Sequence, residues 1–184
     1  MKKNIYLANQ LGFSETGKII LSKHIIPELE KYFTVLEPFR DSGTIKKITS
    51  QDAAKAIILL NRKLMSKSKV MAPILDGSHA TDDGIASEIA EFSLKRLGPI
   101  IALRTDLRQH DSNFVVNPQI SGYIRESGGK ICASLAEWYS ELLCPKTAKG
   151  LIKAAGQYVW QADSVNAKTL LRNGGVFFRY VADN

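Results

Sequence analysis

The chain has 184 residues, a hydrophobic content of 45%, a charged content of 23% and a formal net charge of +7. These values are ordinary for a globular protein, and the length allows one domain with a real core. No apolar run approaches the roughly 18 residues that a membrane span needs, and the N-terminus predicts a first strand rather than a signal peptide. We therefore expect a cytoplasmic protein without a membrane partner.

The positive charge permits a nucleic-acid partner but does not predict one, because the lysines are dispersed along the chain. The densest basic segment, "NRKLMSKSK" (61–69), has no aromatic residues on which bases could stack, so we expect a solvated helix face. Attraction of anionic substrates is a second interpretation. Cys132 and Cys144 lack metal-like spacing and the histidines are scattered, so we expect no metal site.

Short apolar strands alternate with amphipathic segments along the chain. The first strand is predicted at 4–8, followed by a helix that Ser14 caps, that runs to about Lys31 and that Pro27 kinks or splits. Further strands are predicted at 32–38, 70–75, 100–104 and 130–134, with a loop after Pro38. Further helices are predicted at 49–67, 83–97, 117–127 and 135–144, with Asn117 as the cap of the third.

This alternation predicts an α/β fold with a parallel sheet in a single domain over residues 1–184. Its core is expected at about 4–144, and 145–184 form an extension of uncertain role, with a helix near 147–156 and a strand at "GVFFRYV". Ligands of such sheets bind at the carboxyl ends of the strands.

The stretch "LDGSHATDDGIASEIAEF" (75–92) places several acids where a predicted strand gives way to a helix. Glu88 falls at the edge of the apolar stripe formed by Ile85, Ile89 and Phe92. Asp82 or Asp83 caps the helix, and a paired aspartate and glutamate suit cleavage of a glycosidic bond. The residues alone favour a simpler interpretation, in which the aspartate is a plain helix cap and Glu88 pairs with Lys95 or faces solvent.

Other chemistries lack their motifs. There is no GxGxxG after the first strand, no GxxxxGK[ST] and no GxSxG. Nicotinamide, P-loop and serine-hydrolase chemistry are therefore not supported.

Four segments in order resemble the nucleoside 2-deoxyribosyltransferase family, from about Ile5 to Ile124. They are "IYLANQLGFSETGK", "VMAPILDGSHATDDGIASEIAEF", "GPIIALRTDLR" and "NFVVNPQISGYI". The resemblance implies a flavodoxin-like, Rossmann-like three-layer sandwich with a five-stranded parallel sheet, here followed by a C-terminal helical extension. It also implies cleavage of the N-glycosidic bond of 2′-deoxynucleosides and transfer of deoxyribose to another base.

The resemblance also implies roles for individual residues. Glu88 matches the family's nucleophile, Asp82 the acid that helps to protonate the departing base, and Tyr6 the aromatic that holds the nucleophile's carboxylate. Asn61 matches a base-side residue, and Asn117 an amide that binds a sugar hydroxyl in a neighbouring subunit. The remaining expected substrate-binding residues are Gln10, Phe13, Arg40, Asp76, Gly77 and Gly84.

Simpler roles stay open for three of these positions. Tyr6 is also explained as a core aromatic, Asn117 as a helix cap, and Asp76 with Gly77 as a tight turn. We expect no metal or organic cofactor, a nucleoside or nucleotide substrate with a free nucleobase, and a homo-oligomer. The alternatives are a hydrolase of nucleosides or of 5′-monophosphates, with Arg40 and Ser42 on the phosphate, and a non-catalytic nucleotide-binding domain.

Overall fold

The computed structural model describes residues 2–41, 50–76, 81–106 and 115–143. The chain divides into two compact units, Met1–Trp138 and Tyr139–Asn184. The predicted extension at 145–184 and Cys144 lie outside the described residues, whereas Cys132 is a buried cysteine. Among the described helices, none combines the length and hydropathy required to cross a lipid bilayer.

The described strands are short and parallel, as the alternating pattern predicted. The first sheet has the order β2-β1-β3 and the second pairs β4 with β5. Their bounds are Lys3–Tyr6 for β1, Phe33–Leu36 for β2, Val70–Met71 for β3, Ile101–Leu103 for β4 and Lys130–Cys132 for β5. The mixed α/β class with parallel sheets is therefore confirmed.

The predicted single five-stranded sheet is not found, because β3 stops after two residues and the strands form separate sheets of three and two. Pro73 has no N–H to give to the ladder, which ends the regular pairing of the segment predicted as a strand at 70–75. The two sheets still meet through isolated parallel bridges, Met71 to Ile100 and Ile74 to Leu103. The carboxyl ends of β1 and β3 consequently lie at one edge.

Helices fill the connections. They are α1 (Glu15–Ile20), α2 (Ile26–Glu30), α3 (Pro38–Asp41), α4 (Ser50–Lys67), α5 (Asp83–Leu94), α6 (Pro118–Glu126) and α7 (Leu135–Leu142). A 3₁₀ turn, η1 (Leu11–Phe13), precedes α1, and a π-helical turn, η2 (Leu21–Ile25), joins α1 to α2. The cap prediction at Ser14 is confirmed, since its hydroxyl accepts from Gly17 N at 3.0 Å. The predicted break at Pro27 takes the form of this π turn, which accommodates the missing N–H.

One predicted loop is partly wrong. Residues 39–41, expected in a loop after Pro38, form with this proline the helical turn α3 (Pro38–Asp41). Proline suits the first position of a helix, and the Glu37 carboxylate caps the turn by accepting from Arg40 N at 2.7 Å.

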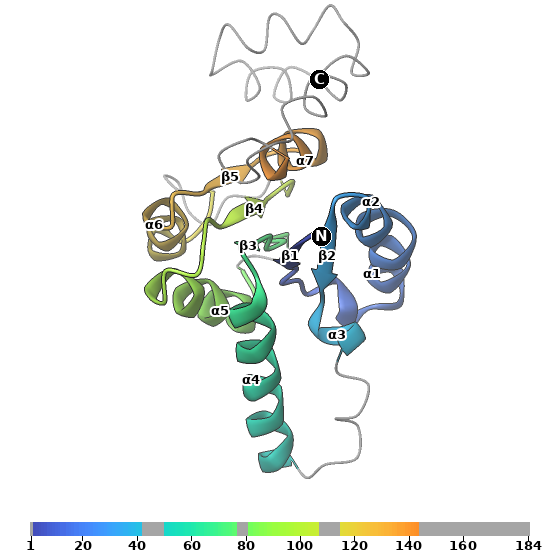
Figure 1. Cartoon of the computed structure of the whole chain (residues 1–184), viewed down its shortest axis with the longest axis vertical. Helices are drawn as coiled ribbons and strands as arrows, with labels where there is room; N and C mark the ends of the chain where they lie inside the picture. The colour runs from blue at the N-terminus through green and yellow to red at the C-terminus, as the bar shows by residue number, and fades with distance from the viewer. Residues whose placement is uncertain (1, 42–49, 77–80, 107–114, 144–184) are drawn as a thin grey trace, which may run out of the picture. The chain divides into compact units, whose positions relative to one another are not determined.

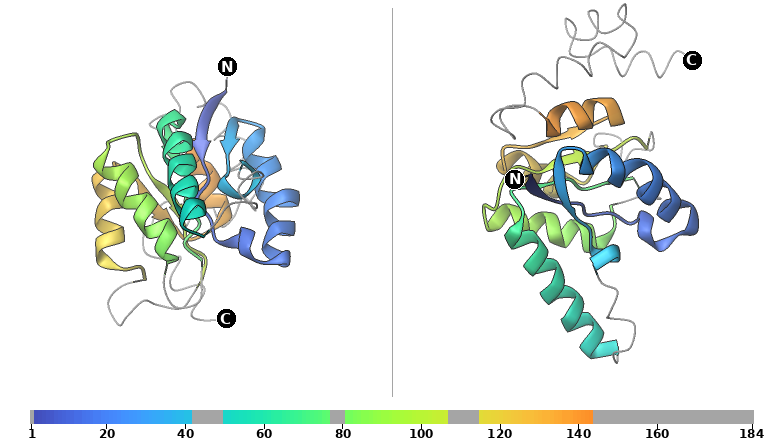
Figure 2. Two further views of the ribbon diagram at one scale, coloured as in Figure 1. Left: turned by 90° about the horizontal axis from the view of Figure 1, so that it is seen from below. Right: turned by 45° about the vertical axis from the view of Figure 1, so that its right-hand side comes forward.

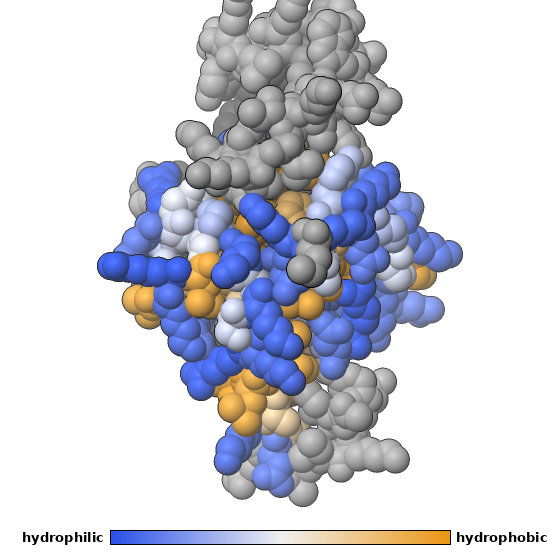
Figure 3. Space-filling view, viewed as in Figure 1, coloured by the Kyte–Doolittle hydropathy of each residue, from blue (hydrophilic) through white to orange (hydrophobic). Residues whose placement is uncertain are grey.

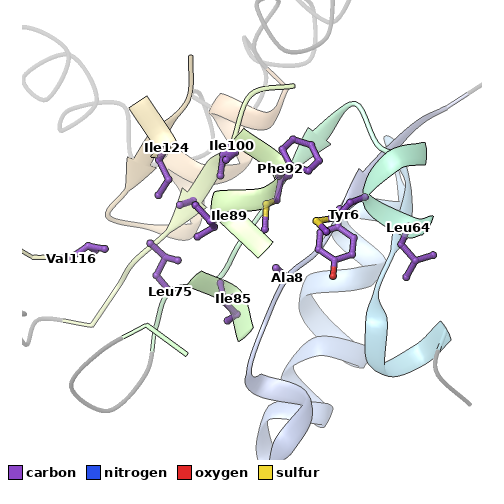
Figure 4. Close-up of a cluster of buried hydrophobic side chains, with 13 residues drawn as sticks. Tyr6, Ala8, Leu64, Leu75, Ile85, Ile89, Phe92, Ile100, Val116 and Ile124 are labelled. Carbon is purple, nitrogen blue, oxygen red and sulfur yellow. The ribbon is translucent and has the colours of Figure 1, made fainter. Parts of the chain in front are cut away.

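The main core lies between the strands and the helices α4, α5 and α6. Figures 1 and 2 show these helices on one side of the strands, with α1 and α2 on the other. Side chains alternate along a strand, so β1 presents Tyr6 to the first side and Ile5 to the second. The cluster on the first side, shown in Figure 4, comprises Tyr6, Ala8, Leu64, Met65, Met71, Leu75, Ile85, Ile89, Phe92, Ile100, Ala102, Val116 and Ile124.

Gly129 lies directly before β5, against the backbone of Ile100 directly before β4. A Cβ at this position would lie 1.9 Å from the Ile100 carbonyl oxygen, a backbone atom that cannot move away by rotation. We expect Gly129→Ala to lower the free energy of unfolding by about 2–4 kcal/mol, measured by urea denaturation. Gly122→Ala is the matched control, because nothing lies within 4 Å of its Cβ position and alanine favours helix α6. Equal stability of the two variants would contradict this account of the contact.

Candidate functional site

Glu88 is a half-buried carboxylate on the second turn of α5. The helix turns Ile85, Ile89 and Phe92 into the core, which confirms the predicted apolar stripe. Glu88 lies at the margin of that stripe, so it contacts the core without facing bulk solvent fully. A carboxyl group in such a place is partly stripped of water, and its charge must be compensated by nearby donors.

Asn61 of α4 supplies one such donor. Its side-chain Nδ2 lies 2.6 Å from Glu88 Oε1, which makes a hydrogen bond between the two helices. Asn61 Oδ1 is buried and has no hydrogen-bond partner within the described residues. The amide is therefore fixed by Glu88 on one side and offers an unused acceptor on the other.

Burial is the main influence on the proton affinity of Glu88 and raises its pKa to about 7. The nearby Tyr6 hydroxyl and the Asn61 amide lower the pKa of Glu88, whereas the charges of Asp82 and Glu91 raise it. Near neutral pH the group therefore passes between its carboxylic acid and carboxylate forms. A carboxylate poised in this way can act as a nucleophile or a base.

Tyr6 projects from β1 into the core (Figure 4). Burial, followed by the negative charge of Glu88, raises the pKa of the Tyr6 hydroxyl, which therefore keeps its proton. The hydroxyl lies near the Glu88 carboxylate but falls short of a hydrogen bond with good geometry, and no other described group pairs with it. It is thus a buried donor available to Glu88 or to a ligand.

Asp82 is the N-cap of α5. Its Oδ1 accepts from Ile85 N at 3.1 Å, so of the two candidate caps Asp82 fills the role. A Cβ at Gly84 would lie 2.9 Å from this oxygen, so glycine leaves room for the capping carboxylate. The negative charge of Asp82 also raises the pKa of Glu88.

Asp76 holds the backbone that follows β4. Its Oδ1 accepts from Thr105 N at 2.6 Å and from Asp106 N at 2.9 Å, while Oδ2 accepts from Thr105 Oγ1 at 2.6 Å. Gln10 Nε2 donates to the Asp76 carbonyl oxygen. Asp76 and Gln10 thus tie three strand ends together, at the edge where the sequence predicted a crevice.

The other predicted residues have contacts of their own. Phe13 is 73% exposed and packs edge-on against Phe39 with ring centroids 4.8 Å apart. The Arg40 guanidinium pairs with Glu30 at 2.7 Å and also donates to Val35 O. Asn117 caps α6, as predicted, by accepting from Gln119 N at 2.9 Å. Gly77 lies outside the described residues.

Comparison with known proteins identifies the family. A family model described as nucleoside 2-deoxyribosyltransferase matches residues 5–137, well over half of the chain. The chain belongs to the nucleoside 2-deoxyribosyltransferase family. A search of curated proteins gave no match.

Solved structures agree with this deoxyribosyltransferase family at the level of the fold. A conserved protein from Enterococcus faecalis V583 is 24% identical with a TM-score of 0.61, over 77% of this chain and 98% of its own. A 2-deoxyribosyltransferase from Bacillus psychrosaccharolyticus is 17% identical with a TM-score of 0.50, over 66% of this chain and 82% of its own.

Two sets of contacts around this deoxyribosyltransferase-family site were not predicted from the sequence. Arg62 and Lys95 both pair with Glu91, with Arg62 Nε 2.8 Å from Glu91 Oε1. Asn9 donates to the buried Glu37 carboxylate at 2.8 Å and accepts from Gly12 N at 3.1 Å, which orders the turn that carries Gln10 and Phe13. The Glu91–Lys95 pair has the i,i+4 spacing of helical ion pairs, so the sequence carried a signal for it. The Arg62–Glu91 pair joins two helices, and its only signal was the position of Arg62 next to Asn61.

Proposed function

We propose that the protein is an enzyme that cleaves the N-glycosidic bond of 2′-deoxynucleosides and transfers the deoxyribose to another base. The observation that supports this function is Glu88. Glu88 lies within the family match over residues 5–137. Its carboxylate is desolvated, its pKa is raised to about 7, and Asn61 donates a hydrogen bond to it. No cofactor takes part, since every group that the chemistry needs is a side chain.

In the proposed reaction, ionised Glu88 attacks the anomeric carbon while the bond from that carbon to the base nitrogen breaks. The electron pair of the broken bond leaves with the base, which takes a proton with the help of Asp82. A deoxyribosyl ester on Glu88 results. A second base then attacks the same carbon and gives up its N–H proton with the help of Asp82, which reverses the proton transfer of the first step. The ester bond breaks and Glu88 is regenerated as a carboxylate. Two displacements at one carbon give net retention of configuration.

The surrounding groups are proposed to hold the reactants. The Tyr6 hydroxyl and the Asn61 amide orient the Glu88 carboxylate, and the unpaired Asn61 Oδ1 is free to accept from the base. Exposed Phe13 offers a ring face for the base. The remaining proposed contacts are from Gln10, Arg40, Asp76, Gly77, Gly84 and Asn117.

We also propose that the protein forms a homo-oligomer in which Asn117 reaches a neighbour's site. Three consecutive apolar side chains of α4, Ile57, Ile58 and Leu59, are 44–56% exposed, and Figure 3 shows apolar surface over this helix. Ile57 and Ile58 share a helix face with Asn61. Light scattering after size exclusion should therefore give a multiple of 20.3 kDa, and Ile58→Glu should lower it. A monomer at every concentration would contradict this proposal.

Incubation with deoxyinosine and free adenine, followed by chromatography, tests the function. We expect new deoxyadenosine. Free deoxyribose without exchange would replace transfer with hydrolysis, and bound ligand without product would make the protein a binding domain. The Arg40 guanidinium is already paired with Glu30, which gives no support to a 5′-phosphate at that position.

A further inference from the structure

Adjacent residues of α4 contact two carboxylates one turn apart on α5. Asn61 donates to Glu88 at 2.6 Å, and the next residue, Arg62, pairs with Glu91 at 2.8 Å. Lys95 pairs with the same Glu91 oxygen, but it is the C-cap of α5 itself, four residues further on. Of these two cations only Arg62 links the helices.

We propose that Arg62 is a positioning residue: its ion pair with Glu91 fixes α4 against α5 and so keeps the Asn61 amide on Glu88. The proposed effect of Arg62 on the hydrogen bond between Asn61 and Glu88 rests on these contacts alone. The consequence of this effect for catalysis rests on the proposed function. We use the term Arg62 link for the contact between Arg62 and Glu91.

Three features make the position of the Asn61 amide sensitive to the Arg62 link. Asn61 Oδ1 has no partner within the described residues, so no second hydrogen bond fixes the amide. The guanidinium of arginine is planar and directional, which makes the pair sensitive to the relative rotation of the helices. A donor displaced by about 1 Å from a carboxylate loses most of its hydrogen bond, because such bonds weaken steeply with distance.

The charged and titratable groups that act on Glu88 come from three elements. Tyr6 faces it from β1, while Asp82 acts from the N-cap of α5 and Glu91 from the helix itself. From α4, the neutral Asn61 amide donates to Glu88, and Arg62 pairs with Glu91. Glu91 bears a negative charge that raises the pKa of Glu88, and Arg62 and Lys95 both offset that charge. Replacement of either cation by glutamine therefore removes one positive charge next to the Glu91 carboxylate, but only Arg62→Gln breaks the Arg62 link.

This pair gives a charge-matched experiment on the full chain. The side-chain carboxyls of glutamate are labelled with ¹³C and titrated by NMR, with the Glu88 signal assigned from its absence in Glu88→Gln. We expect Arg62→Gln to raise the Glu88 midpoint by about 0.5–1 pH unit through loss of the Asn61 donor, and Lys95→Gln by less than about 0.2. In Asn61→Ala, adding Arg62→Gln should change the midpoint no further.

Equal shifts in Arg62→Gln and Lys95→Gln would overturn the proposal, because charge alone would then explain them. A full additional shift in the Asn61→Ala background would overturn it as well. Urea denaturation checks that each variant folds. If Arg62→Gln does not fold, Arg62→Lys replaces it, because lysine keeps the charge without the planar guanidinium. If the NMR shifts appear while the wild-type protein transfers no deoxyribose, the proposed function fails and the positioning role stands.

Discussion

Glu88→Gln is expected to lower kcat/KM for deoxyribose transfer by at least about 10³-fold, because an amide cannot form the sugar ester at a useful rate. The glutamine side chain is isosteric and can still accept from Asn61 Nδ2, so the packing of α4 on α5 is kept. The measurement is the exchange of adenine into deoxyinosine at saturating base. Asp83→Asn, an exposed acid in the first turn of the same helix, is the control and should retain activity.

The same variant should become more stable than the wild type at high pH. The folded Glu88 pKa of about 7 lies above its ordinary value of 4.5, so between these values the folded chain keeps a proton that the unfolded chain has lost. This contribution favours folding below pH 4.5 and is lost as the pH rises through 7. We therefore expect Glu88→Gln to gain about 2 kcal/mol relative to the wild type at pH 8 and little at pH 4.5. A stability difference that does not vary with pH would contradict a desolvated Glu88.

The second large effect is the pH dependence of the wild-type reaction. A nucleophilic carboxylate must be ionised, so kcat/KM should rise with pH along an acid limb whose midpoint is near 7. Activity at pH 6 should be about a tenth of the plateau value. Asn61→Ala removes a donor to the ionised form and should move this limb to higher pH.

Initial rates from pH 5 to 9 at low substrate concentration give this profile, since kcat/KM reports the free enzyme. Circular dichroism at each pH is the control for unfolding. A rate that stays constant between pH 5 and 8, or an acid limb near 4.5, would mean that the essential carboxylate is solvated and is not Glu88 in this environment.

The sequence predicted the local features of the fold well. Helix caps depend on a side chain and a backbone N–H two or three residues away, so Ser14 and Asn117 could be assigned from their neighbours alone. The stripe that buries Ile85 and Ile89 also follows from helical spacing. Strand lengths were overestimated where a proline removes a ladder donor, as Pro73 does after β3.

The candidate site could be predicted only in part. Residue type and helical position were enough to single out Glu88. Its contact with Asn61 joins residues 27 positions apart, and the pairing depends on how two helices pack, which one sequence does not report. The same holds for Arg62 and Glu91, 29 positions apart. Asp76 shows the opposite case, because a residue predicted at the crevice holds the segment after β4 instead. Its Oδ1 accepts from two backbone N–H groups and its Oδ2 accepts from the Thr105 hydroxyl.

The most direct test of the central claim is to trap the sugar on the enzyme. The full chain is incubated with a fluorinated 2′-deoxynucleoside analogue that forms the ester faster than it releases it, and intact-mass spectrometry is followed by peptide mapping. The account predicts one added fluorodeoxyribosyl group per chain, on the peptide that contains Glu88, and none in Glu88→Gln. No adduct under turnover conditions, or an adduct on another side chain, would contradict it.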